Sequence, residues 1–433
     1  MAMGLKEARH LMGRAGFGGR PDELEALASM GRKAAVRRLL ATARTKASRP
    51  GPSWGMEGTP SAAERESMSR KELRRLSKAR GEQIQAWWMK EMLETSSPVT
   101  ERMTLVWHNH FTSSLRKVKW SPFLYRQNVL LRRHALGNFE ALLRGVIRDP
   151  AMMFYLDNQS NRKRDPNENF ARELLELFTL GEGHYSEKDI KEAARAFTGW
   201  RVRRRTGDFR FVKADHDKGQ KHFLGKRGDF DGDGIVDVLL AHPRTAERIV
   251  EMLWGEFISE TPTRKDVVRL AKVFRSAKYE IKPLLEAIWT SDAFWDTQNR
   301  GALVKSPVDL VVGTVRTFGL KIGDPTPLLK ACRQLGQIIL QPPNVKGWPG
   351  GTRWISTHTL LARHQLLSRV VRKGLGKGDG AMNRWLGDNN QSDKAAIKKA
   401  QAVLLPLDPV GQIASKGDRA LAQLLLDPTY QLK

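Results

Sequence analysis

The stretch DPNENFARELLELFTLG, residues 165–181, decides the fold because it carries a complete set of signals for one helix. Asp165 can cap the first turn, Pro166 suits the first helical position, and Glu168 stands where a capping box places its acid. Gly181 then supplies the stop after a mostly apolar run. The spacing predicts an amphipathic helix whose broad apolar face packs into a core.

The polar row of this helix has two interpretations. One is a solvated face held by ion pairs such as Glu168 to Arg172 and Arg172 to Glu176, and spacing alone favours it. The other is a site: Glu173 and Glu176 lie one turn apart and could point together into a cleft. Paired carboxylates in a cleft can bind a cation or share acid–base work, since each raises the pKa of the other.

Length and charge narrow the function classes. The 433 residues are enough for two domains or one large helical domain. Lys and Arg number 74 against 47 Asp and Glu, a formal charge of +27, which favours polyanionic partners such as an anionic glycan, nucleic acid or an acidic protein. A single cysteine, Cys332, excludes an internal disulfide and a multi-cysteine zinc site.

Signals for export or membrane insertion are missing from the sequence. The N-terminus has no apolar h-region and no small-residue cleavage site, and no run approaches the ~20 apolar residues of a spanning helix. These absences predict a soluble, cytoplasmic protein.

Helical periodicity over most of the chain predicts a mainly α fold, a large orthogonal array of many helices. We expect one large helical domain at 1–372, with a loop insertion at 45–61. A flexible loop at 373–395 would then open a C-terminal helical extension, 373–433, packed on that domain. The strand signal predicts one small β-hairpin near 200–214, where WRVRRR and DFRFVKAD alternate around a turn.

The most specific chemical motif is DFDGDGIVD at 229–237, which predicts a calcium-type loop. Leu240 stands where such a loop normally has a bidentate acid, so the alternatives are a ligand from another segment, weak affinity, or a turn without metal. A transition metal at another site is a further alternative. The residues at the ligand positions, including one main-chain carbonyl, are Asp229, Asp231, Asp233, Ile235 and Asp237.

Two histidines in WHNHF are candidates for acid–base work. His108 and His110 are two residues apart, so on a helix they project to opposite sides and at most one should face a site. A histidine between aromatic residues is more often part of the core.

Two other segments carry candidate residues. Asp157 and Asn158 stand in a polar loop just before the 165–181 helix, and loops on a rigid scaffold often hold functional residues. Trp348 and Trp354 belong to QPPNVKGWPGGTRW, which is either a packed loop or a ligand wall whose rings stack on sugars or bases.

Several long strings occur together: ARHLMGRAGFGG, WHNHF, LDNQSN, NENFARELLELFTLG, AARAFTGW, DGDGIVDVLL and PPNVKGWPGG. In this order they resemble a bacterial domain-of-unknown-function family, numbered eighteen hundred, over roughly residues 5–370. The resemblance implies a single large, mainly helical domain. It also implies a co-encoded partner family, numbered fifteen hundred and one, whose members look exported, so export together with that partner is an alternative to a cytoplasmic location.

Three functions follow as hypotheses. The first is an enzyme of hydrolase type, or an enzyme accessory, acting on an anionic glycan or other surface polymer. The second is a non-enzymatic binding or chaperone-like subunit for a co-encoded exported protein, and the third is nucleic-acid binding. The expected catalytic residues are Glu173, Glu176, His108, His110 and Asp157. The expected ligand-binding residues are Asn158, Asn167, Asn169, Arg172, His216, Lys346, Trp348 and Trp354.

Overall fold

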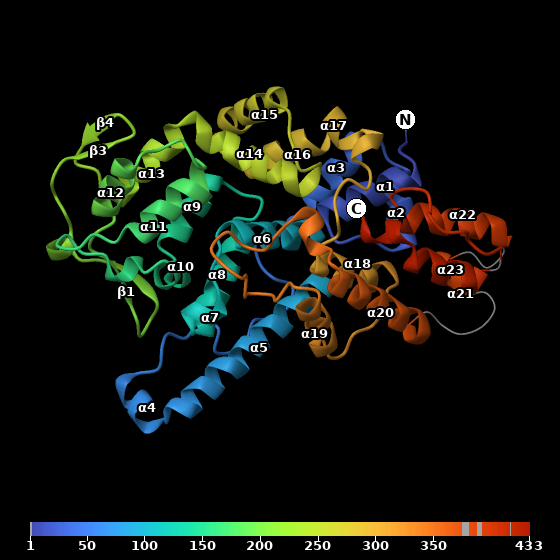
Figure 1. The fold of residues 1–433 in the computed structure, drawn as a ribbon, viewed down its shortest axis with the longest axis horizontal. Helices are drawn as coiled ribbons and strands as arrows, with labels where there is room; N and C mark the ends of the chain where they lie inside the picture. Colours follow the sequence, from blue (N-terminus) through green and yellow to red (C-terminus); the bar gives the residue numbers. More distant parts are fainter. Residues whose placement is uncertain (1, 375–380, 388–391, 416) are drawn as a thin grey trace.

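The computed structural model describes residues 2–374, 381–387, 392–415 and 417–433, and within them helices dominate (Figure 1). Two small two-stranded sheets accompany the helices in this part of the chain. The mainly α fold is therefore as predicted. None of the described helices is both long and apolar enough to cross a membrane.

The two ends of the described chain pack together at one end of the molecule (Figure 1). The N-terminal helices are α1 (Leu5–Ala15), α2 (Pro21–Ala28) and α3 (Arg32–Ala41). The C-terminal elements are α20 (Thr357–Gly374), α21 (Ala381–Leu386), α22 (Asp393–Leu404), α23 (Gly417–Leu426) and the short 3₁₀ turn η6 (Pro428–Gln431). Helix α1 packs against α22, and α2 packs against α21.

The flexible loop predicted at 373–395 is wrong in part. Helix α20 continues to Gly374, α21 occupies the middle of the segment, and α22 begins at Asp393. Residues 375–380 and 388–391 of that prediction lie outside the described residues.

A long helix projects from the body of the molecule (Figure 1). This helix, α5 (Arg70–Glu94), carries the short α4 (Ala62–Ser67) at its far end. Ser69 and Glu72 form a capping box at its start, which satisfies two otherwise unpaired amides and separates α5 from α4. Its second half is buried around Trp88, while its first half makes fewer contacts, among them the ion pair of Arg80 with Glu57 at 2.8 Å.

The centre of the molecule is a group of helices around buried aromatic side chains. Trp107 lies fully buried in α6, and its ring stacks on Phe111 and meets Phe139. This aromatic core fixes the position of the end of α6. The central helices are α6 (Pro98–His110), α7 (Leu115–Val118), α8 (Ser121–Arg133), α9 (Phe139–Ile147) and α10 (Pro150–Tyr155).

The two hairpins lie at the same end of the molecule, with α12 between β1 and the β3–β4 pair in the view of Figure 1. Strands β1 (Trp200–Arg203) and β2 (Asp208–Phe211) pair antiparallel, with Trp200 opposite Phe211, as predicted near 200–214. Strands β3 (Lys221–Phe223) and β4 (Lys226–Gly228) form a second hairpin that the sequence did not predict. Helix α12 (Glu187–Ala196) packs against β3, which the 3₁₀ turn η3 (Lys213–Asp215) precedes.

The remaining helices precede the 341–354 segment, which is a loop as expected until its last turn. These helices are α13 (Gly232–Ala241), α14 (Pro243–Phe257), α15 (Arg264–Ser276), α16 (Ile281–Trp289), α17 (Asp292–Trp295), α18 (Pro307–Thr317) and α19 (Thr326–Gln334). Two 3₁₀ turns, η4 (Thr297–Asn299) and η5 (Gly351–Trp354), complete them.

Candidate functional site

The 165–181 helix begins later than predicted and changes type midway. Asn167, not Asp165, is the N-cap, because its side chain accepts a hydrogen bond from the amide of Asn169 at 2.9 Å. The α-helical part is α11 (Glu168–Glu173), and a π-helix, η2 (Leu174–Thr179), follows it directly. Gly181 ends the element with φ +84°, as expected. Single π-helical turns inside helices are frequent at functional sites.

The polar row of this element is partly a solvated face. Arg172 pairs with Glu168 at 3.3 Å, as the spacing predicted, but its closer partner is Glu187 of α12 at 2.7 Å. Arg172 therefore ties two helices together. Because both of its partners bind it on the outer surface, it is a structural clamp and not a free ligand-binding cation.

Glu173 differs from its neighbours in the row. It is half-buried, and burial raises the pKa of its carboxyl, with the nearby charge of Glu176 adding to the effect. No hydrogen bond offsets these effects. Tyr155 lies close enough for the charge of Glu173 to contribute to a raised phenol pKa, after burial as the main cause. Such a carboxyl has the property that a general acid or base requires.

Glu176 connects this carboxyl to the 341–354 loop. It accepts a hydrogen bond from the hydroxyl of Tyr185 at 3.2 Å and lies 3.6 Å from the ammonium of Lys346. Lys346 also contacts Glu182 at 3.3 Å. Burial and the charge of Glu176 together raise the pKa of Tyr185 to about 12. Lys346 of the 341–354 loop therefore lies beside the carboxylate pair formed by Glu173 and Glu176.

Beside Lys346 opens a cleft of about 640 Å³ between α6, α14 and the 341–354 loop. Arg248 is its most unusual residue: the guanidinium is half-buried, and its Nε atom has no acceptor among the described residues. Burial lowers the pKa of Arg248. Other polar residues lining the cleft are Asn109, His110, Glu256, Glu260, Lys346, Thr352 and Arg353.

The two histidines have different environments. His110 lines the cleft, and its Nε2 atom lies 3.1 Å from the carbonyl oxygen of Phe178. Burial, with help from the charge of Arg248, lowers the pKa of His110 to about 3. The neutral ring therefore donates from Nε2 and leaves Nδ1 as an acceptor.

His108 is buried between two indole rings, Trp88 and Trp348, each with its centroid 5.5 Å from that of the imidazole. Burial lowers its pKa to about 3. The prediction that His108 carries protons for catalysis is therefore wrong, because a neutral ring enclosed in the core cannot reach a ligand.

The tryptophans of the 341–354 loop are also core residues. Trp348 is 5% exposed and Trp354 is 6% exposed, so neither presents a face for stacking on a sugar or a base. The packed-loop interpretation is correct for both. Asn109, which the sequence did not single out, holds the loop: its side-chain oxygen accepts the amide of Trp348 at 2.7 Å. Gly347, at φ +84°, is required there because a Cβ would lie 2.3 Å from that oxygen.

The remaining predicted ligand residues are mostly engaged in folding. Asn158 is fully buried, and its side-chain oxygen accepts a hydrogen bond from Asn161 at 3.2 Å. The Asn169 amide donates to the carbonyl of Leu156, and His216 is buried with Nδ1 at 2.9 Å from the carbonyl of Thr198. These polar residues fix the loop and hairpin that surround α11, so the structure does not place them in the cleft.

Asp157 is the exception in that loop. It adopts a left-handed conformation with φ +60°, remains half-exposed, and pairs with Lys117 at 2.6 Å. The same lysine lies 5.7 Å from the ring centre of Tyr155, the phenol influenced by Glu173. Asp157, through Lys117, and Glu173 are therefore both neighbours of Tyr155.

The segment 229–237 does not form the calcium-type loop. Asp231 caps α13 by accepting the amide of Gly234 at 3.0 Å, so the helix starts where the loop should wrap an ion. Asp233 pairs with Arg144 at 3.1 Å and with Arg148, and Asp237 pairs with Arg144. The predicted loop conformation is wrong, because helix capping and two arginines engage these acids.

The other acidic residue of that segment, Asp229, lies 3.5 Å from the ammonium of Lys221. In the described part of the chain no group of three or more His, Cys, Asp or Glu side chains is arranged to hold a metal ion. Calcium binding stays a prediction.

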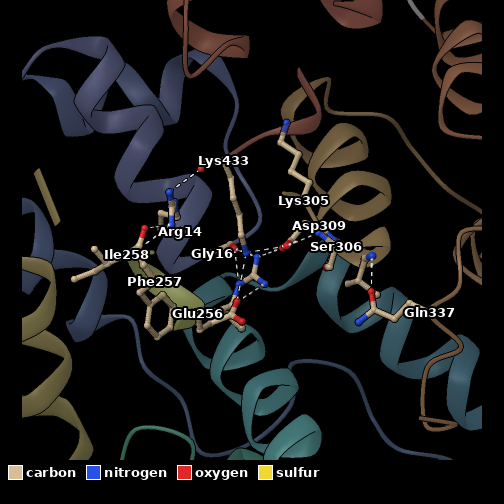
Figure 2. A network of polar contacts seen from close by, with 12 residues as sticks. Arg14, Gly16, Glu256, Phe257, Ile258, Lys305, Ser306, Asp309, Gln337 and Lys433 are labelled. Carbon is tan, nitrogen blue, oxygen red and sulfur yellow. Dashed lines mark hydrogen bonds and ion pairs between the residues drawn. The ribbon is translucent and has the colours of Figure 1, made fainter. Parts of the chain in front are cut away.

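Glu256 of the cleft wall belongs to a largely buried network of charges (Figure 2). Arg102 of α6 binds Asp309 of α18 and lies 3.3 Å from Glu256, while the ammonium of Lys433 reaches Asp309 at 2.8 Å and Glu256 at 3.4 Å. Burial alone would raise the pKa of Asp309, but Arg102 and Lys433 hold it below its usual range. Arg14 joins the network by donating to the main-chain oxygen of Lys433 at 2.7 Å.

Comparison with known proteins identifies the family. No curated protein and no solved structure matches the chain. The family described as "Protein of unknown function (DUF1800)" matches residues 10–432, which include the cleft, the carboxylate pair and all of the charged network except Lys433. The chain belongs to the DUF1800 family.

Proposed function

We propose that the cleft binds an acidic group of an anionic glycan or a similar surface polymer, and that the protein is a hydrolase, or an accessory to one, acting on that polymer. One observation carries the proposal: Arg248 lines the cleft with a half-buried guanidinium whose Nε lacks an acceptor. Buried guanidinium groups are normally paired, and they bind carboxylate, sulfate or phosphate groups in two-point contacts.

The surroundings of Arg248 support an acidic ligand. Lys346 and Arg353 line the same cleft, and the chain as a whole carries a formal charge of +27. A volume of about 640 Å³ accommodates a sugar unit or two. The buried Trp348 and Trp354 offer no stacking surface, so recognition would depend on charge and hydrogen bonds.

In this proposal Glu173 is the acid–base residue. Burial and the charge of Glu176 raise the pKa of Glu173, and Lys346 of the cleft lining lies 3.6 Å from Glu176. His110, neutral and fixed by the Phe178 carbonyl, offers Nδ1 as a hydrogen-bond acceptor for a sugar hydroxyl.

Binding to dextran sulfate, with uncharged dextran as the comparison, tests the first step. We expect Arg248→Gln to weaken binding by about tenfold or more, since a charge-assisted hydrogen bond contributes about 1.5–3 kcal/mol. Arg264→Gln is the control, because Arg264 is 67% exposed and pairs with Glu247 outside the cleft. Equal binding by both variants, or equal affinity for the uncharged polymer, would refute the proposal.

Release of reducing ends from an anionic polymer tests the second step. A hydrolase should lose turnover in Glu173→Gln while the affinity for the polymer stays within about twofold, because the substitution keeps the size of the side chain. Binding without turnover in the unaltered protein would assign it the accessory role.

A second function, a binding subunit for a partner protein, is favoured by a different observation. Much of the polar motif around α11 is buried and mutually bonded, as the contacts of Asn158, Asn161 and His216 show. Such a hydrogen-bond network can stabilise a binding scaffold without taking part in catalysis. Co-purification with the co-encoded protein, unaffected by both Arg248→Gln and Glu173→Gln, would be the result expected for that role.

A further inference from the structure

A second cavity lies beside the charged network. It has a volume of about 50 Å³, its lining includes Asp309 and Lys433 of the network, and it shares no lining residue with the cleft. Figure 2 shows the side chain of Lys305 extending away from Asp309, and Lys305 lines this cavity. The first helix, α1, supplies Arg9 and Gly13 to its wall.

Arg9 is a buried cation for which the described part of the chain supplies no carboxylate partner. Only 8% of the residue is exposed, and its Nε and Nη2 atoms have no hydrogen-bond acceptor among the described residues. Burial, reinforced by the charge of Arg300, lowers the pKa of Arg9 to about 9. Native structures rarely leave a buried charge unpaired, because its removal from water costs several kcal/mol. Arg9 therefore brings an uncompensated positive charge to the wall of the cavity.

Lys305 adds a second cation to the same cavity. Its ammonium lies 3.7 Å from the ring centre of Tyr430. This cation–π contact does not neutralise the ammonium, which can still bind an anion. Burial and the charge of Arg9 are the main causes that lower the pKa of Lys305 to about 7. The two cations therefore disfavour each other, and a negative charge between them would relieve both.

The charge of the cavity wall is unbalanced. Its lining includes three cationic side chains, Arg9, Lys305 and Lys433, and one side-chain carboxylate, that of Asp309. Asp309 is already bound to Arg102 and Lys433. Within the described chain the wall thus holds no side-chain carboxylate that is free to neutralise Arg9.

We propose that this cavity binds one small inorganic anion, of chloride to phosphate size, held by Arg9 and Lys305. About 10–15 Å³ of cavity volume is enough to hold one water molecule, so a cavity of about 50 Å³ has room for such an ion. Gly13 provides the opening, since a Cβ built there meets no atom within 4 Å. The site is independent of the function proposed for the cleft.

Thermal unfolding of the full chain tests the proposal, in a buffer whose only anion is gluconate. Added sodium chloride or sodium phosphate should raise the unfolding temperature with a saturating dependence, as ligand linkage requires. Calorimetric titration with the better of the two should give one site per chain. The two salts distinguish a halide from an oxyanion, and a dependence that never saturates with either would overturn the proposal.

Three variants locate the effect. Arg9→Met should abolish the saturating shift, and Gly13→Val should do the same by filling the cavity while both cations remain. Arg248→Gln, in the cleft, should leave the shift unchanged, which separates this site from the cleft. The proposal fails if Arg9→Met or Gly13→Val retains the full shift. If Arg9→Met does not fold, Gly13→Val alone decides.

A chemical readout gives a second, independent measurement. At pH 7 the amine of Lys305 should react rapidly with acetic anhydride, because a substantial fraction of it is uncharged. The bound anion should favour the ammonium form and slow its acetylation at least tenfold, as measured by peptide mass spectrometry. An exposed lysine, Lys282, is the internal reference. Equal slowing at both lysines, or none at Lys305, would contradict the proposal.

Discussion

Asp309→Asn should be among the most destabilising conservative substitutions in this chain. The carboxylate is buried and binds two cations, Arg102 and Lys433, while its second oxygen also accepts the amide of Ser306 at 3.0 Å. The side-chain amide of asparagine keeps the shape of the carboxylate but removes its charge. Its N–H₂ group would also face Arg102 or Lys433, which are hydrogen-bond donors themselves. Glu256 would then be the single carboxylate left for both cations.

The expected loss is about 3–5 kcal/mol in the free energy of unfolding, the usual cost of removing one partner from a buried ion pair. Since whole domains have about 5–15 kcal/mol of stability, the urea midpoint at pH 7 should fall markedly. Asp309 has a depressed pKa, so its contribution is fully present above the ordinary aspartate pKa of about 3.9 and is lost as the pH falls below it. The difference between the variant and the unaltered protein should therefore narrow below about pH 4.

Asp22→Asn provides the matched control. Asp22 also pairs with an arginine, Arg20, at 3.1 Å, but its side chain is 67% exposed, and exposed pairs contribute about 0–1 kcal/mol. If Asp309→Asn costs no more than Asp22→Asn, the network does not act as a buried charge cluster. The reasoning would then be refuted.

Three further changes have defined outcomes. Glu173→Gln should raise the urea midpoint at pH 7 but not near pH 4. Burial and the charge of Glu176 raise the pKa of Glu173, so the protein loses stability as this carboxyl ionises with rising pH. An equal or lower midpoint at pH 7 would contradict this reasoning. Gly347→Ala should cost about 1–3 kcal/mol, since its φ is +84° and the new Cβ would lie 2.3 Å from the side-chain oxygen of Asn109. Gly255→Ala, inside α14 with no atom within 4 Å of the new Cβ, should instead gain about 0.5–1 kcal/mol, and calorimetry of both variants would detect opposite signs.

The helix at 165–181 shows how far the sequence alone could go. Its apolar spacing and the stop at Gly181 were predictable, because both depend on local chemistry. Its start was misplaced by two residues, since Asp165 is paired with Arg162 in an isolated bridge and Asn167 takes the cap. The change to a π-helix has no local signal of comparable strength. The second hairpin was missed because its three-residue strands are too short to show alternation.

The site was harder to predict than the fold. Spacing indicated that His108 and His110 face opposite ways, but only tertiary packing shows that His110 lines the cleft. Trp348 has the same residue type and loop context whether it binds a ligand or fills the core, so its burial could not be read from the sequence. Arg248 and Asn109 carried no local signal, because their roles depend on partners that are absent or far away along the chain.

The hydrogen bond from Arg14 to the main-chain oxygen of Lys433 has a consequence for folding. It joins residues 419 positions apart, and α1 packs against α22 near the other end of the sequence. During synthesis the first helix therefore emerges from the ribosome long before its partners, with apolar residues such as Leu11 exposed. Topologies that depend on such distant contacts fold slowly and expose aggregation-prone surface in the meantime. The nascent chain should consequently need chaperone protection until its last segments have been translated.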